Sequence, residues 1–263
     1  LEHVLQVRDE KIRVLFLQAY PSFEYRFLRD LLGREPTIDL ETWLQDADAE
    51  HADQDPSQRR SFPTDREELF GFDCIIFGDV DPARLSRSQQ DDLAAFVKDP
   101  VSGGALIFLA GPLYTPKGYI NSPLVSVMPF DPSRASLPPS GRARTDGFRI
   151  KPTQLGLAFP GMRIADSPGS AVSPLSMGPS LPEARTLADN ENVDTLETTI
   201  PSDEEIREYT GQTSDQFVWR NLPPAYWRLS IPDWKAGAMP LALTDLDSSN
   251  DSFFPLDWTP SFE

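Results

Sequence analysis

The sequence has one cysteine and two histidines among its 263 residues, which leaves little material for several kinds of chemistry. Cys74 alone can form neither an internal disulfide nor a multi-cysteine metal site. His3 and His51 are the only histidines, and a serine or cysteine nucleophile normally needs such a base. Nucleotide-binding glycine motifs, of the P-loop or dinucleotide type, are also missing, so the backbone cradle that holds phosphates is not expected.

Long hydrophobic runs are missing as well. No stretch approaches the roughly 20 apolar residues that a membrane span needs, and no signal peptide is recognisable. The chain begins with Leu1 rather than methionine, so we expect it to be a segment of a longer protein. Targeting signals would then lie in the rest of that protein, and any link to a membrane would run through those flanking segments.

Positive charge is scarce, with 24 lysines and arginines against 41 acidic residues and a net charge of −17. Such a field repels nucleic acid phosphates and anionic lipid, so we expect neither as a partner. The length allows a sizeable hydrophobic core. The 26 prolines gather in the second half, which indicates long irregular stretches there.

The segment Lys11–Leu32 opens a strand–helix repeat. Arg13–Leu17 is a short apolar run typical of a fully buried strand. Ser22 can cap a following helix. Five apolar side chains of that helix recur at helical spacing, and we expect them to face the core: Phe23, Phe27, Leu28, Leu31 and Leu32.

The same unit recurs as far as Phe130. Ser86 and Gln89 form a capping-box pattern for a helix that carries Leu93, Ala94, Phe96 and Val97 on one face. Apolar strands alternating with amphipathic helices predict an α/β fold whose mainly parallel sheet is covered on both faces. Three further strands are expected, the first of them near a sheet edge: Ile38–Leu44, Asp73–Phe77 and Ala105–Leu109.

The second half differs in character. Residues 131–147 and 165–215 are rich in proline, serine and acids, and we interpret them as irregular insertions. We expect a strand or turn in Phe148–Phe159, and a short helix at Ser202–Tyr209. Two strands that return to the sheet are expected at Tyr226–Ile231 and Met239–Leu243. The resulting division is a leader (1–10), one domain (11–243) and an acidic tail (244–263).

Five segments together resemble a known family. They are KIRVLFLQAYPSFEYRFLRDLL, DCIIFGDVDP, LSRSQQDDLAAFVKD, GGALIFLAGP and LPPAYWRL. They resemble the class I glutamine-amidotransferase-like domain, in the version found in large bacterial membrane proteins beside von Willebrand factor A domains. The resemblance covers about Arg8–Phe130 and, more loosely, Trp219–Leu243. It implies a flavodoxin-like, three-layer sandwich and a membrane-anchored parent protein.

The catalytic residues of that family are missing. Active members carry a cysteine on a tight turn after a strand, with a histidine and an acid further along. Aligned on Gly111, the nucleophile position holds Leu109, which cannot attack a carbonyl. Cys74 lies one strand earlier, in an apolar run that should bury it and raise its pKa. Neither histidine lies late in the chain. We therefore expect no triad chemistry.

A crevice at the carboxyl ends of the strands is the candidate site, because ligands of open parallel sheets bind there. We expect Arg26 to form an ion pair with Asp79 or Asp81 that joins two turns. The alternative is that the crevice binds a ligand. Its residues would be Tyr20, Glu24, Tyr25, Arg26, Asp79, Asp81, Gly111, Pro112 and Tyr114.

Two other residue groups carry weaker signals. Acids at 46, 48, 50, 53 and 55 resemble a calcium loop in number, but His51 and Ser57 stand where glycine and glutamate are required, so a solvated loop is expected. The aromatic residues Trp219, Tyr226, Trp227 and Trp234 are expected to fill a core, with a stacking surface for sugar or peptide as the alternative.

The resemblance, together with the missing nucleophile and base, implies a non-catalytic binding or scaffolding module of a larger, membrane-anchored bacterial protein. Its partner would be another domain of that protein, a peptide or protein, or a small polar ligand, and no metal or cofactor is expected. The alternative is a metal-dependent hydrolase that uses Asp79, Asp81 and Glu24. Three carboxylates converging within metal-ligand range would favour that enzyme, whereas an Arg26–carboxylate pair in the same space would argue against it.

Overall fold

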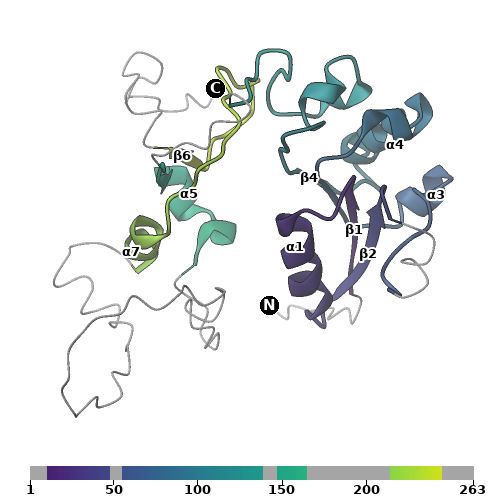
Figure 1. Ribbon diagram of the computed structural model, residues 1–263, viewed down its shortest axis with the longest axis horizontal. Coiled ribbons are helices and arrows are strands. Elements are labelled where there is room, and N and C mark those ends of the chain that lie inside the picture. The colour runs from purple at the N-terminus through teal and green to yellow at the C-terminus, as the bar shows by residue number, and fades with distance from the viewer. Residues whose placement is uncertain (1–10, 48–54, 139–146, 165–213, 245–263) are drawn as a thin grey trace, which may run out of the picture. The chain divides into compact units, whose positions relative to one another are not determined.

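The computed structural model describes residues 11–47, 55–138, 147–164 and 214–244 (Figure 1). Contacts between residues divide the chain into two units. The first is Leu1–Gly141 with Arg228–Ala238, and the second is Arg142–Trp227 with Met239–Glu263.

A four-stranded parallel sheet forms the centre of the first unit. Its strands are β1 (Ile12–Gln18), β2 (Ile38–Leu44), β3 (Cys74–Phe77) and β4 (Ala105–Phe108). They lie in the order β2-β1-β3-β4, and each neighbouring pair is parallel. The predicted α/β class with a mainly parallel sheet is thus confirmed, as is the place of β2 at an edge.

The apolar run of β1 is buried on both faces of the sheet. Successive side chains of a strand point to opposite faces. Leu15 and Leu17 accordingly belong to one hydrophobic cluster, whereas Val14 and Phe16 belong to another. The first cluster includes residues of α3 (Arg66–Leu69) and α4 (Arg87–Lys98), and the second includes Tyr25 of α1 (Phe23–Gly33). Burial of both faces explains why β1 shows no polar alternation.

Both predicted helix caps are present. The Ser22 hydroxyl oxygen accepts a hydrogen bond from the Tyr25 N–H at 3.1 Å, at the start of α1. At the start of α4, the Gln89 N–H donates to the Ser86 hydroxyl at 3.2 Å, and the Ser86 N–H donates back to Gln89 Oε1 at 2.9 Å. Three 3-10 turns complete this unit: η1 (Pro82–Arg84), η2 (Lys117–Tyr119) and η3 (Pro123–Ser126).

The orientation of α1 differs from the prediction. Phe23, Phe27 and Leu31 are 74%, 40% and 45% exposed, so the expectation that they face the core is wrong. Leu28 and Leu32 do pack against the sheet, around the buried Tyr25. The apolar residues of this helix extend over more than half of its circumference, and only one side of it meets the sheet.

The second unit is built on a two-stranded antiparallel ribbon. Strand β5 (Ile150–Pro152) pairs with β6 (Ala242–Thr244). Among its described residues, the helices are α5 (Gln154–Ala158), the 3-10 turn η4 (Pro160–Met162) and α7 (Ser214–Asn221). Arg149 Nη1 donates to the Arg220 carbonyl at 2.8 Å and so satisfies an acceptor at the end of α7.

Two strand predictions for the second half are wrong. Tyr226–Ile231 contains no strand, and only an isolated bridge joins Ser230 to Ser136. The strand that overlaps Met239–Leu243 is β6, which pairs with β5 and not with the four-stranded sheet. A strand in Phe148–Phe159 is confirmed as β5. The predicted helix Ser202–Tyr209, residues 165–213, the leader and residues 245–263 of the tail lie outside the described residues, whereas Thr244, the expected start of the tail, ends β6.

No helix in the described part of the chain has the length and apolar character needed to cross a membrane.

Candidate functional site

The strand order places two turns of the candidate site side by side. The chain leaves β1 for β2 on one side and returns for β3 on the other, so strand order reverses between β1 and β3. That reversal is where open parallel sheets bind ligands, beyond the carboxyl ends of the strands. Tyr20 follows β1 and Asp79 follows β3, and the Ala19 N–H donates to the Asp79 carbonyl at 3.1 Å.

The Asp79 carboxylate is buried and fully engaged within the protein. It is only 3% exposed. Its Oδ1 accepts the N–H groups of Tyr114 at 2.7 Å and Thr115 at 2.8 Å. Its Oδ2 accepts the Leu113 N–H at 3.0 Å and the Tyr20 hydroxyl at 3.1 Å. Because a carboxylate has about four acceptor sites, these four donors leave it none for a ligand.

Two glutamines hold the backbone of the same turn. Gln18 Oε1 accepts the Asp79 N–H at 2.8 Å. Gln45 Oε1 accepts the Asp81 N–H at 2.7 Å, and its amide donates to the Asp81 carbonyl at 3.2 Å. Both glutamines are buried. Neither glutamine was predicted from the sequence, although a polar residue at the end of an otherwise apolar strand was the available signal.

Gly111 and Tyr20 enclose Asp79 from two sides. A Cβ atom at Gly111 would lie 2.2 Å from the Asp79 Cγ atom, so only glycine leaves room for the carboxylate. Burial of the Tyr20 hydroxyl and the nearby negative charge of Asp79 raise the Tyr20 pKa from its ordinary 10.0 to about 12. Tyr20, Asp79, Gly111 and Tyr114 are therefore in one contact network.

The predicted ion pair between Arg26 and an aspartate of this turn is not formed. Arg26 Nε donates instead to the Ser22 carbonyl at 3.4 Å. Asp81 Oδ1 accepts the Ala83 N–H at 2.9 Å and caps η1. Glu24 and Arg26 are both exposed on α1. Within the described ranges, Glu24, Asp79 and Asp81 do not gather into a group that could hold a metal ion.

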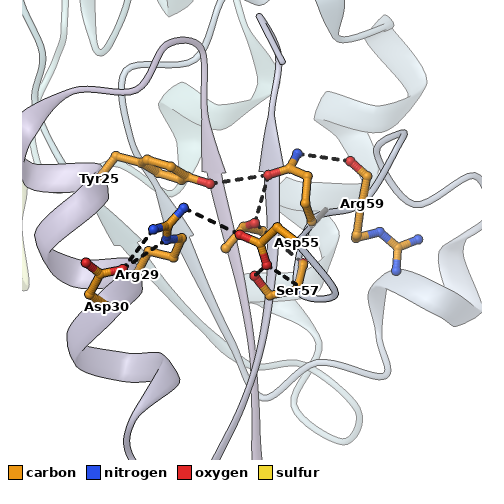
Figure 2. A network of polar contacts seen from close by, with 8 residues as sticks. Tyr25, Arg29, Asp30, Asp55, Ser57 and Arg59 are labelled. Carbon is orange, nitrogen blue, oxygen red and sulfur yellow. Dashed lines mark hydrogen bonds and ion pairs between the residues drawn. The ribbon is translucent and has the colours of Figure 1, made fainter. Parts of the chain in front are cut away.

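Tyr25 belongs to a polar network with the segment after β2 (Figure 2). The side chain is 1% exposed and packs against Phe16, with 5.1 Å between ring centroids. Its hydroxyl donates to Gln58 Oε1 at 3.3 Å, and the Thr42 hydroxyl donates to the same oxygen at 3.0 Å. Burial raises the Tyr25 pKa. Tyr25 therefore joins α1 to the segment after β2 and does not line the candidate surface.

The described part of the acidic loop is held by ion pairs. Asp55 accepts from Arg29 at 3.4 Å and from the Ser57 hydroxyl at 2.7 Å (Figure 2). Asp46 pairs with Arg84 at 3.0 Å. The acids at 48, 50 and 53 lie outside the described residues. The two described acids therefore serve local structure.

Leu109, which the resemblance aligned with a nucleophile, is a packed apolar residue. Leu109 lies against the hydrophobic cluster that includes Val14 and Phe16, and its N–H donates to the Phe77 carbonyl at 2.8 Å. Cys74 is half-buried beside the same cluster. Burial, and the nearby charge of Asp73, raise the Cys74 pKa, so its thiol is less reactive than an exposed one.

Exposed apolar side chains lie close to the buried Asp79 carboxylate in the turns that follow β1 and β4. Leu113 is 60% exposed and Phe23 is 74% exposed. Leu113 and Tyr20 lie next to each other, because the Leu113 N–H and the Tyr20 hydroxyl donate to the same Asp79 oxygen. Phe23 follows Tyr20 by three residues, at the start of α1. Pro21 and Pro112 are also exposed. We call Tyr20, Pro21, Phe23, Pro112 and Leu113 the apolar rim.

The four aromatic residues of the second half do not form one core. Tyr226 and Trp227 are 55% and 40% exposed, so the expectation that they fill a core is wrong. Trp234 belongs to the first unit and packs edge-on against Phe130, with 6.4 Å between ring centroids. Trp219 belongs to the second unit, and its indole N–H donates to the Met162 carbonyl at 3.0 Å.

No protein-family model, curated protein or solved structure matches this chain.

Proposed function

We propose that this chain is a non-catalytic, amidotransferase-like binding or scaffolding module of a larger, membrane-anchored bacterial protein. Its contact surface is the apolar rim at the carboxyl ends of the strands, and its partner is a protein segment, either from another domain of the same protein or from a separate chain. Recognition without turnover is the mechanism.

The strand order supports the family assignment. A flavodoxin-like sheet has the order 2-1-3-4-5, and β2-β1-β3-β4 is the order of its first four strands. The positions of the family motifs agree with this. Glu24-Tyr25-Arg26 follows β1 and Gly78-Asp79-Val80-Asp81 follows β3, and both motifs lie at the carboxyl ends of neighbouring strands.

The absence of a nucleophile supports recognition rather than turnover. Leu109 offers no reactive atom, and Cys74 lies in β3, beside an apolar cluster. Asp79 cannot act as a ligand-binding acid in this arrangement, because its four acceptor sites are occupied by the protein's own donors. The carboxylate lies in a concavity of successive backbone N–H groups, an arrangement that elsewhere binds anions.

The exposure of the apolar rim carries the proposal. Two large side chains, Phe23 and Leu113, are more than half exposed, and the Asp79 carboxylate near them has its acceptor sites occupied. Exposed apolar side chains that surround a fixed turn are suited to another protein surface, which covers them and gains hydrophobic free energy. A small polar ligand would find no free acceptor on the Asp79 carboxylate. This favours a protein partner over a small molecule.

Site-specific photo-crosslinking in the intact parent protein tests this. A photoreactive phenylalanine analogue at Leu113 should crosslink to one defined protein segment, identified by mass spectrometry. The same analogue at Val101 is the matched control, since Val101 is 92% exposed but lies before β4, at the opposite end of that strand. The Phe23→Ser substitution should abolish the Leu113 crosslink.

Crosslinks of equal yield and identity from positions 113 and 101 would contradict the proposal. So would a hydrolase activity, glutamine hydrolysis included, that a single substitution at the strand ends abolishes. Both outcomes can be read from a folded protein, since neither Leu113 nor Val101 is buried.

A further inference from the structure

A second feature of the first unit lies away from the strand ends, beside α4. A groove of about 500 Å³ runs between α4 and η3, and Lys235 contributes to it. This volume is in the range of small-ligand sites. The apolar part of its lining comes from Ala94 and Ala95 of α4 and from Pro123 and Val125 of η3. The small alanine side chains leave the space open.

Opposite charges stand at the two ends of the α4 wall. Asp91, Ala94, Ala95 and Lys98 all line the groove, at positions i, i+3, i+4 and i+7 of one helical face. Seven residues of helix separate the Asp91 and Lys98 Cα atoms by about 10.5 Å. Within the described part of the chain, neither of these two side chains has a hydrogen bond or an ion pair. Both charges are free to meet a ligand.

The η3 side of the groove adds polar groups that are only partly engaged. The Lys235 ammonium donates to the Val125 carbonyl, which leaves further N–H donors on the same nitrogen. The Ser122 hydroxyl oxygen accepts the Leu124 N–H at 3.1 Å and keeps its own O–H group. The groove thus combines an apolar floor with an acid, two lysines and a hydroxyl.

We propose that this groove binds a short extended peptide that carries a positive group and a carboxylate about three residues apart. An extended chain advances about 3.4 Å per residue, so three residues span about the 10.5 Å between the Asp91 and Lys98 Cα atoms. The peptide's ammonium pairs with Asp91, and its carboxylate pairs with Lys98. Its small side chains rest on Ala94 and Ala95.

Trialanine, titrated into the full chain and followed by amide NMR, tests the proposal. Its two termini supply the required charges at the required distance. We expect saturable shifts of amides in α4 and η3. Exposed ion pairs contribute up to about 1 kcal/mol, so Asp91→Asn and Lys98→Gln should each weaken binding about two- to five-fold. Asp92→Asn is the matched control, because Asp92 is the neighbouring acid and does not line the groove.

Blocked peptides separate a direct contact from an indirect effect. N-acetyl-trialanine should bind the native chain about two- to five-fold more weakly than trialanine, yet bind Asp91→Asn as well as trialanine does. Trialanine amide, which lacks the carboxylate, should likewise bind the native chain more weakly than trialanine does, yet bind Lys98→Gln as well as trialanine does. Equal binding of all three peptides to the native chain would overturn the proposal. Shifts that fall outside α4 and η3, or no saturable shift at all, would also overturn it.

Discussion

The Tyr20 hydroxyl donates a hydrogen bond to the Asp79 carboxylate at 3.1 Å, across the point where the strand order reverses. In a sheet of this topology that point is open to ligands. Here the protein fills it with its own carboxylate and three backbone N–H groups. The interior of the candidate crevice is therefore structural, and the surface that we propose for recognition is the apolar rim.

The first prediction concerns the Asp79 carboxylate itself. Asp79→Asn should lower the free energy of unfolding by about 2–4 kcal/mol, because an amide has only one acceptor oxygen and its NH₂ group would face donors. Urea unfolding measures this. Asp81→Asn should cost only a few tenths of a kcal/mol, since asparagine caps a helix about as well as aspartate. Equal losses from the two variants would show that the Asp79 contacts contribute little.

Gly111 gives a second, steric test of the same contact. Gly111→Ala would place a Cβ atom 2.2 Å from the Asp79 Cγ atom, so the turn must shift. We expect a loss of about 1–3 kcal/mol in thermal or urea unfolding. Gly33→Ala is the control, because a Cβ atom there would meet no atom within 4 Å. It should leave stability unchanged or raise it slightly. An unaffected Gly111→Ala variant would contradict the close packing.

The raised pKa of Tyr20 predicts a pH dependence. Between pH 10 and about 12 the unfolded state has released the Tyr20 proton and the folded state still holds it. The unfolded state then binds fewer protons, so the free energy of unfolding falls as pH rises through this window. Tyr20→Phe should lose less stability over the same interval. Parallel stability curves for the two proteins, measured by urea unfolding, would contradict the assigned pKa.

The strand–helix repeat could be predicted from the sequence because buried parallel strands have near-continuous apolar runs. The capping residues Ser22 and Ser86 also act locally, so their hydrogen bonds follow from the residue type. The prediction of a strand at Tyr226–Ile231 was wrong because strand formation there does not depend on local residues alone. Its aromatic residues indicated burial, but a strand requires a partner with matching register, and sequence composition does not specify one.

The candidate site was predicted only in part. The positions of Tyr20 and Asp79 followed from the strand ends, so both could be assigned to one region. The three groups that occupy Asp79 from the other side are backbone N–H groups of Leu113, Tyr114 and Thr115. Every residue except proline has a backbone N–H donor. The pattern of side chains therefore does not predict which of these donors will bind Asp79. The Arg26 ion pair was inferred from charge alone, and those donors outcompete it.

The last prediction separates the two sides of α1. Phe23→Ser removes a large side chain that is 74% exposed, and it should change the free energy of unfolding by no more than about 0.5 kcal/mol. Tyr25→Ala removes a side chain that is 1% exposed, and it should cost about 3–5 kcal/mol through the cavity and the lost hydrogen bond to Gln58. Urea unfolding of both variants checks this.

If Phe23→Ser were as damaging as Tyr25→Ala, Phe23 would be a core residue and could not belong to the proposed recognition surface. A small effect would show that the Phe23 side chain does not stabilise the fold. Its apolar surface is then available to a partner protein, which can cover it without destabilising this chain.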